Sequence, residues 1–196
     1  MAGTGTKDRI LDTTAELFRR YGYTGTGLKQ IVAAANAPFG SVYHHFPGGK
    51  AELGEAVIRR SGQMYMELVG AVLVASPDPV SAARDAFAGA AAVLEATDYV
   101  DACPIATVAL EVASSNEPLR IATADVFESW ITGLTTLYTE AGIAAEPARN
   151  LAVVFIELLE GGFLLSRAAR TTDALAAAGA AMAALTEAAL RPFPTQ

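Results

Sequence analysis

The sequence predicts an all-α protein, and three observations support this class. Alanine supplies 41 of the 196 residues, and it is the best helix former because it loses no side-chain entropy on ordering. Apolar residues recur at spacings of three and four along most of the chain, with no sustained β-branched alternation. Hydrophobic residues make up 52% and charged residues 18% of the chain, which excludes disorder and allows a sizeable core.

Two helices are predicted in the first part of the chain. An apolar stripe covers residues 7–21, and Gly22 stands where a glycine commonly ends a helix. A second, short apolar pattern runs over residues 28–35. Asn36 tolerates a left-handed backbone and Pro38 cannot continue a helix, so we expect a turn after this pattern.

A third short helix is predicted after this turn. Phe39, Val42 and Phe46 lie three and four residues apart, and Pro47-Gly48-Gly49 ends the pattern. Two short helices joined by a turn form a helix-turn-helix, whose second helix can lie in the major groove of DNA. Enzymes also contain short helical corners, so the alternative is a helical-bundle carrier or enzyme with no role in DNA binding.

Six further helices are predicted from Lys50 onward. The first begins near Lys50, and Ser76-Pro77-Asp78-Pro79 separates it from the next. Pro104, Pro118 and Pro147 each stand where a first helical turn accepts proline. The remaining helices are predicted over residues 79–96, 104–114, 117–141, 147–169 and 172–190.

The charge distribution divides the chain in two. The net charge is −7, yet residues 1–60 hold eight Lys/Arg against five Asp/Glu, and the rest holds six against sixteen. A basic part joined to an acidic part is typical of a polyanion-binding head on a separate body. We therefore expect two domains, one over residues 1–50, the head, which would bind the polyanion, and one over residues 51–196, the body.

Polar and small residues of the third predicted helix could face DNA. Tyr and His side chains donate hydrogen bonds to phosphate oxygens, and Lys29 and Lys50 add positive charge at either end. The Thr26 hydroxyl could cap the second helix or meet a phosphate. The groove-facing candidates are Gly40, Ser41, Tyr43, His44 and His45.

Several motifs occur together in the head: Phe18-Arg-Arg-Tyr-Gly-Tyr, the segment from Thr26 to Ile31, Gly40-Ser-Val-Tyr-His-His-Phe, and Lys50 with Leu53. In this combination residues 7–60 resemble the DNA-binding domain of the TetR family of bacterial one-component transcriptional repressors. The Tyr-His-His-Phe-Pro-Gly-Gly-Lys run, with Cys103-Pro-Ile-Ala and Ala109-Leu-Glu in the body, is similar to the LmrA/YxaF-like branch of that family.

This resemblance implies a repressor that binds palindromic operator DNA as a homodimer and is released by a small apolar ligand. It also implies that the head, residues 1–50, is the DNA-binding domain and that the body, residues 51–196, is the ligand-binding and dimerisation domain. Phe39 to His45 would form the recognition helix, and Gln30 would join the same DNA-binding surface. Phe39 stands where the family often has Lys, and Gly27 where a second Ser or Thr is common, so these departures bear on the operator sequence. The phosphate contacts implied are those of Thr26, Lys29, Tyr43 and Lys50.

The body offers candidates for dimerisation and for ligand binding. The predicted helix over residues 147–169 is apolar almost all round, so it is either central or covered by a second copy. The expected dimer interface consists of Leu158, Gly161, Gly162, Leu165, Met182 and Leu185. Aromatic residues could line a pocket for an unidentified inducer or simply form the core, and the candidates are Phe87, Phe127, Trp130, Tyr138 and Phe155.

No catalytic, cofactor or metal site is expected. No GxSxG, HExxH, P-loop or GxGxxG motif occurs, and adjacent histidines on a helix point about 100° apart, which excludes chelation of one metal. The single cysteine, Cys103, cannot form an internal disulfide, and a buried structural thiol is favoured over a redox sensor. The longest charge-free apolar run, Ala174 to Thr186, is too short to span a bilayer, and residues 1–9 lack a signal-peptide pattern. We expect a cytoplasmic protein that is not an enzyme.

Overall fold

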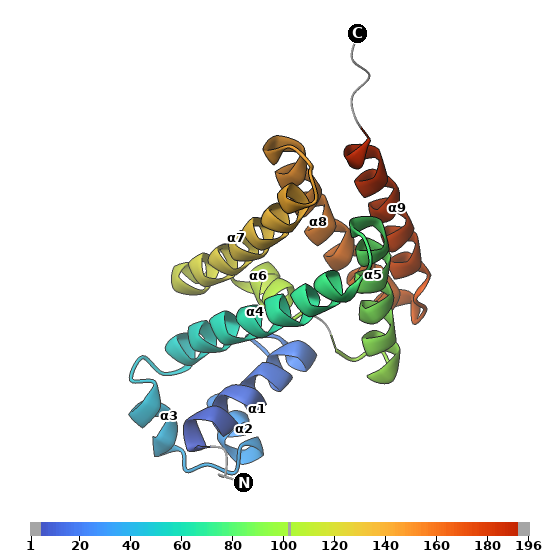
Figure 1. The fold of residues 1–196 in the computed structure, drawn as a ribbon. Helices are drawn as coiled ribbons and strands as arrows, with labels where there is room; N and C mark the ends of the chain where they lie inside the picture. Colours follow the sequence, from blue (N-terminus) through green and yellow to red (C-terminus); the bar gives the residue numbers. More distant parts are fainter. Residues whose placement is uncertain (1–4, 102, 192–196) are drawn as a thin grey trace. The chain divides into compact units, whose positions relative to one another are not determined.

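The computed structural model of the chain describes residues 5–101 and 103–191. Within these residues all regular structure is α-helical, which confirms the predicted class (Figure 1). The helices of the described residues are α1 (Thr6–Tyr21), α2 (Leu28–Ala34), α3 (Gly40–His45), α4 (Lys50–Ala75), α5 (Pro79–Ala96), α6 (Pro104–Val112), α7 (Glu117–Glu140), α8 (Ala145–Ala169) and α9 (Asp173–Leu190).

Residues at the helix ends explain where the helices begin and stop. Gly22 follows α1 with a φ of 70°, and Asn36 follows α2 with a φ of 47°, so both have the positive φ that Gly adopts freely and Asn tolerates. The Asp78 carboxylate caps α5 by accepting hydrogen bonds from the backbone N–H groups of Val80 and Ser81, both at 2.9 Å. The helix breaks predicted at Gly22, Asn36 and Asp78 are therefore confirmed.

The described chain forms two compact units, and the first contains residues 5–64 and 103–126. It holds α1, α2, α3 and α6 together with the N-terminal parts of α4 and α7. Arg60 of α4 is ion-paired with Asp8 and Asp12 of α1, both at 2.9 Å. The fully buried apolar side chains of this unit include Ile10, Phe18, Ile31, Val42, Leu53, Ile58, Ile105 and Val108.

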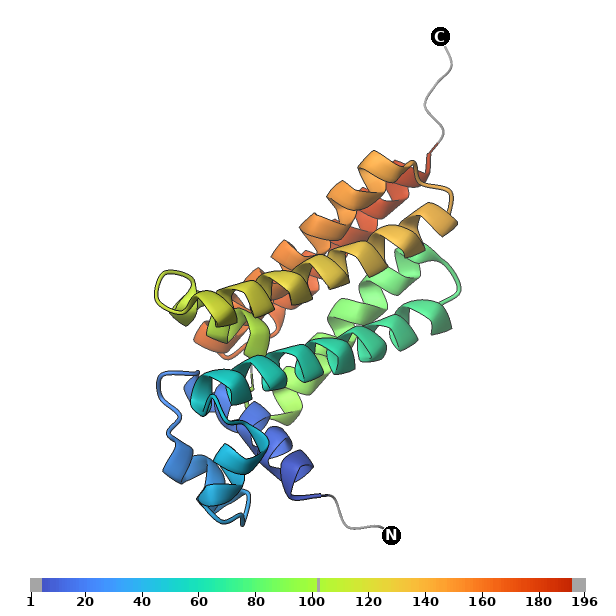
Figure 2. The same cartoon turned by 90° about the vertical axis from the view of Figure 1, so that its left-hand side faces the viewer.

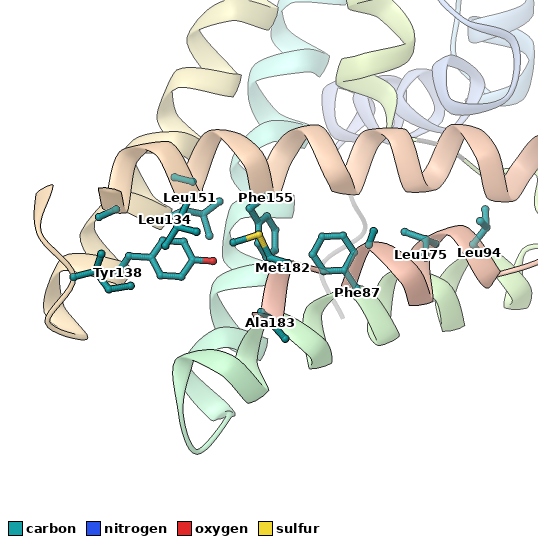
Figure 3. Close-up of a cluster of buried hydrophobic side chains, with 14 residues drawn as sticks. Phe87, Leu94, Leu134, Tyr138, Leu151, Phe155, Leu175, Met182 and Ala183 are labelled. Atoms are coloured by element: carbon teal, nitrogen blue, oxygen red, sulfur yellow. The ribbon is translucent and has the colours of Figure 1, made fainter. Parts of the chain in front are cut away.

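The second compact unit contains residues 65–101 and 127–191. In it α9 packs against both α5 and α8, and Figure 2 shows α8 and α9 side by side. Phe87 of α5 meets Phe155 of α8 edge to face, with ring centroids 5.1 Å apart. Figure 3 shows these rings within a buried cluster that also contains Leu94, Leu134, Tyr138, Leu151, Leu175, Met182 and Ala183.

Among the described helices, α9 is long and apolar enough to cross a membrane by length and composition alone. Its Leu175 and Met182 side chains are completely buried in the cluster of the second unit. A core helix passes the same length and composition test, and the packing of α9 against α5 and α8 accounts for its apolar character.

Candidate nucleic-acid interface

α2 and α3 are joined by a tight turn and held by buried side chains. The N–H of Ala37 donates to the carbonyl oxygen of Val32 at 2.9 Å, next to the left-handed Asn36. Ile31 of α2 and Val42 of α3 are completely buried. Because these side chains fix one face of each short helix, the remaining faces are presented to solvent, as a helix-turn-helix requires.

The solvent-facing side of α2 and α3 carries most of the predicted DNA-binding residues. Tyr43 is 49% exposed and Phe39 is 45% exposed, and their ring centroids lie 5.9 Å apart. The His44 and His45 rings meet edge to face at 4.8 Å, with His45 half-buried. Ser41 is also half-buried. The other predicted residues that are exposed here are Lys29, Gln30, Gly40 and His44.

Lys50 begins α4 and directs its ammonium group at an aromatic ring. Its Nζ lies 4.2 Å from the centroid of the Tyr23 ring, a cation–π contact. Burial lowers the pKa of Lys50, and the nearby Glu111 carboxylate opposes that shift. In this conformation the ammonium group contributes to packing within the first unit, and its contact with a phosphate stays a prediction.

Thr26 requires a correction. Its side chain is completely buried, and its hydroxyl donates to the carbonyl oxygen of Gly22 at 2.7 Å. The residue before α2 is Gly27, whose N–H donates to the Gln30 side chain at 3.4 Å. The expectation that Thr26 caps α2 is therefore wrong, because its hydroxyl already serves the turn before the helix and is not presented to a phosphate.

The exposed groups on α2 and α3 suit recognition of DNA. The Tyr43 hydroxyl, the His44 imidazole and the Lys29 ammonium group can donate to phosphate oxygens. Serine, histidine and glutamine side chains can also bond the edges of bases in the major groove. In the described part of the chain no group of three His, Cys, Asp or Glu side chains could hold a metal ion. Cys103 is buried, in the position that caps α6.

The aromatic candidates for a ligand site all lie in the second unit, most of them buried. Phe87, Tyr138 and Phe155 belong to the buried cluster of Figure 3. Trp130 is 7% exposed and meets the half-buried Phe127 edge to face at 5.6 Å. Burial raises the pKa of Tyr138, and a hydrogen bond to Thr186 opposes that shift. Whether any of these rings contacts a ligand stays a prediction.

The dimer candidates separate into two groups. Met182 is completely buried, and Gly162 is buried against Leu175 of the same chain, where a Cβ would lie 2.7 Å from the Leu175 Cδ2. Both residues therefore pack inside one chain, and their assignment to a chain–chain interface is corrected. Leu165 is 61% exposed and Leu185 is 44% exposed. Leu158 and Gly161 are half-buried.

Glu111 of α6 is a candidate that periodicity and composition did not single out. Its two carboxylate oxygens accept from the backbone N–H groups of Tyr23 and Thr24, at 3.0 and 2.7 Å. The partners are 88 and 87 residues apart in sequence, so no local pattern reveals the contact. The only signal in the sequence is the Ala109-Leu-Glu motif itself.

Comparison with known proteins gives two family matches. Residues 10–57 match the model of the bacterial regulatory proteins of the tetR family. Residues 79–181 match the model of the C-terminal domain of LmrA/YxaF-like transcriptional regulators.

Individual relatives agree with these matches. The chain is 36% identical over 160 residues to the uncharacterized HTH-type transcriptional regulator YxaF of Bacillus subtilis, covering 82% of this chain and 84% of that protein. It is 28% identical over 169 residues to the HTH-type transcriptional regulator LmrA of the same organism, covering 86% of this chain and 90% of that protein. A crystal structure of a TetR transcriptional regulator from Legionella pneumophila is similar at 26% identity and a TM-score of 0.77, covering 93% of this chain and 97% of that one.

These relatives are regulators of transcription, not enzymes. Both family models match where the sequence motifs predicted them, the first across α2 and α3 and the second from α5 into α9. The chain therefore belongs to the TetR family of transcriptional regulators, in its LmrA/YxaF-like branch, and carries a DNA-binding helix-turn-helix.

Proposed function

We propose that this chain is a cytoplasmic repressor that binds a palindromic operator as a homodimer and releases it when a small apolar molecule binds the second compact unit. The observation that carries the DNA-binding part is the division of α2 and α3 into two faces. Ile31 and Val42 are completely buried, whereas Tyr43 is 49% exposed. The buried face fixes the helices, and the exposed face carries donors for DNA.

Two kinds of DNA contact are proposed on the exposed face. Tyr43 and Lys29 donate to phosphates, which positions α3 on the duplex without reading its sequence. Ser41 and His44, on the same helix as Tyr43, contact the edges of bases, and these contacts specify the operator sequence. Gln30, Phe39, Gly40 and His45 border these residues.

Exposed leucines support the homodimer. Leu164 and Leu165 of α8 are 64% and 61% exposed, and Leu185 of α9 is 44% exposed. Exposed leucines on two helices that pack against each other are apolar groups that a second copy can bury. A two-fold dimer also presents two copies of α3, which suits a palindromic site.

The aromatic content of the second unit supports an apolar ligand. Trp130 and Phe127 form an edge-to-face pair, and apolar ligand sites in helical proteins lie between helices lined by such rings. A ligand can weaken operator binding only if its affinity differs between the DNA-bound and free forms. A coupling of about 1–3 kcal/mol corresponds to roughly 5- to 150-fold.

Selection of genomic fragments tests the proposal. The full-length protein is incubated with sheared genomic DNA from its source, and bound fragments are recovered and sequenced. We expect one or a few sites with two-fold symmetry, and Ser41→Ala or His44→Ala to change the recovered sequence. Recovery of random fragments, or of none, would overturn operator binding. Neutral aromatic compounds are then screened for release of the recovered duplex, and Trp130→Ala should abolish that release while DNA binding remains.

A further inference from the structure

The turn between α1 and α2 is held by a carboxylate from a distant helix. Each carboxylate oxygen of Glu111 in α6 accepts one hydrogen bond, from the backbone N–H of Tyr23 at 3.0 Å and from that of Thr24 at 2.7 Å. Hydrogen bonds to an ionised acceptor are stronger than those between neutral groups. All three residues belong to the first compact unit, so the contact lies within one body.

The backbone beside this carboxylate is shaped to admit it. Gly22 has a φ of 70° and a ψ of −179°, a combination that is open almost only to glycine. A Cβ at Gly22 would overlap the Glu111 carboxylate. Glycine is therefore required at position 22 for two reasons: its backbone conformation is open almost only to glycine, and a Cβ would occupy the space of the Glu111 carboxylate.

A cation on α4 completes the arrangement. Lys50 lies over the Tyr23 ring at 4.2 Å, and its charge interacts with that of Glu111. A lysine in the first turn of a helix opposes the helix dipole, so a nearby carboxylate compensates for its position. Tyr23 is thus held through its backbone by α6 and through its ring by α4.

The held turn leads directly into the helix-turn-helix. Thr26 extends this hydrogen-bonded turn. Its N–H donates to the carbonyl oxygen of Tyr23 at 3.3 Å, and its hydroxyl donates to the carbonyl oxygen of Gly22 at 2.7 Å. α2 begins two residues later, at Leu28. α2 and α3 both pack against α1, so the turn that Glu111 holds lies where the chain passes from α1 into the helix-turn-helix.

We infer that Glu111 is a positioning residue for operator binding, acting through the Tyr23–Thr24 backbone without touching DNA. This inference rests on the proposed function. Removal of the Glu111 carboxylate should therefore weaken DNA binding. Charge alone would have the opposite effect, because removing a negative charge from a DNA-binding unit strengthens its binding to phosphate.

The test uses Glu111→Gln in the full-length protein. Glutamine keeps the side-chain size but loses the charge and one of the two acceptors. Leu110→Ala is the matched control, because Leu110 is the preceding residue on α6 and is 84% exposed. Amide hydrogen exchange is measured at Tyr23 and Thr24, and fluorescence anisotropy measures affinity for a labelled duplex recovered by the wild-type protein. Circular dichroism fixes a temperature at which all variants are folded.

We expect Glu111→Gln to speed exchange at both amides and to weaken duplex binding about tenfold, with the salt dependence of binding unchanged because no phosphate contact is lost. Gly22→Ala should have the same effects, and Leu110→Ala neither. Unchanged exchange would show that the carboxylate does not hold the turn, and faster exchange with unchanged or tighter binding would show that the turn does not position α2 and α3. Either result overturns the inference. Failure of the wild-type protein to bind any duplex would instead overturn the proposed function, and the inference with it.

Discussion

Gly162 of α8 and Leu175 of α9 lie so close together that a Cβ on the glycine would approach the Leu175 Cδ2 to 2.7 Å. Leu175 is completely buried and cannot move aside freely. This glycine therefore sets the distance between two helices of the same chain.

Gly162→Val should destabilise the protein, because the added side chain overpacks this contact. We expect a loss of about 1–3 kcal/mol in the free energy of unfolding, measured with urea. Gly89→Ala is the control, since nothing lies within 4 Å of a Cβ at that position of α5. A Gly162→Val protein as stable as wild type would show that α8 and α9 are not held at this distance.

Tyr43→Phe should weaken operator binding without affecting folding. The substitution removes only the hydroxyl of a side chain that is 49% exposed. Loss of one hydrogen bond to a charged acceptor is worth about 1.5 kcal/mol or more, or roughly tenfold in Kd. Tyr21→Phe is the control, because Tyr21 is also exposed, at 55%, and ends α1. Equal affinities of the Tyr43→Phe and wild-type proteins in a band-shift assay would remove Tyr43 from the interface.

The fold could be predicted from the sequence because its signals are local. The helices predicted over 79–96 and 172–190 are α5, with the same bounds, and α9, which begins one residue later. Proline in a first helical turn, and glycine or asparagine after a last turn, restrict or permit the backbone conformation at their own positions. The ends of helices can therefore be predicted from the sequence alone. The exposed positions of α2 and α3 follow from the same periodicity.

The contacts that could not be predicted connect residues far apart in the chain. Glu111 accepts a hydrogen bond from a backbone N–H 88 residues away, and α6 packs against α1, which is likewise far away in sequence. Periodicity also shows which face of a helix is apolar, but it does not show whether that face is covered by the same chain or by a second copy. For this reason the sequence predicts one surface for Met182 and Leu165, although Met182 packs inside its own chain and Leu165 is exposed.

Leu165→Glu should separate the proposed dimer into monomers. A charge placed on an exposed leucine does not disturb the core of the chain, but it would be buried without a partner at a two-fold interface. Light scattering should give twice the chain mass of 20.3 kDa for the wild type and that mass itself for the variant. Leu110→Glu, on an 84% exposed residue of α6, should remain dimeric. A monomeric wild type, or a dimeric Leu165→Glu protein, would contradict the proposed interface.

The cap of α5 should make part of the stability depend on pH. The N–H of Ser81, its hydroxyl and the N–H of Val80 all donate to Asp78 and hold the pKa of this carboxyl below its ordinary value of 3.8. A carboxyl whose pKa is lower in the folded state stabilises the fold above the unfolded pKa, and this contribution is lost as pH falls through the folded pKa. The melting temperature of Asp78→Ala should therefore lie below that of wild type at pH 7, and the gap should narrow below pH 3.8. A gap that stays constant down to pH 3 would contradict this assignment.

The exposed face of α2 and α3 should bind a specific duplex through phosphates and base edges. The salt dependence of affinity for the selected duplex, measured beside a scrambled duplex of the same length, tests it most directly. A dimer with at least six phosphate contacts should lose about 10³-fold in affinity between roughly 50 and 200 mM salt. The selected duplex should bind at least about 10³-fold more tightly than the scrambled one. An affinity that does not change with salt, or that is equal for both duplexes, would contradict the claim.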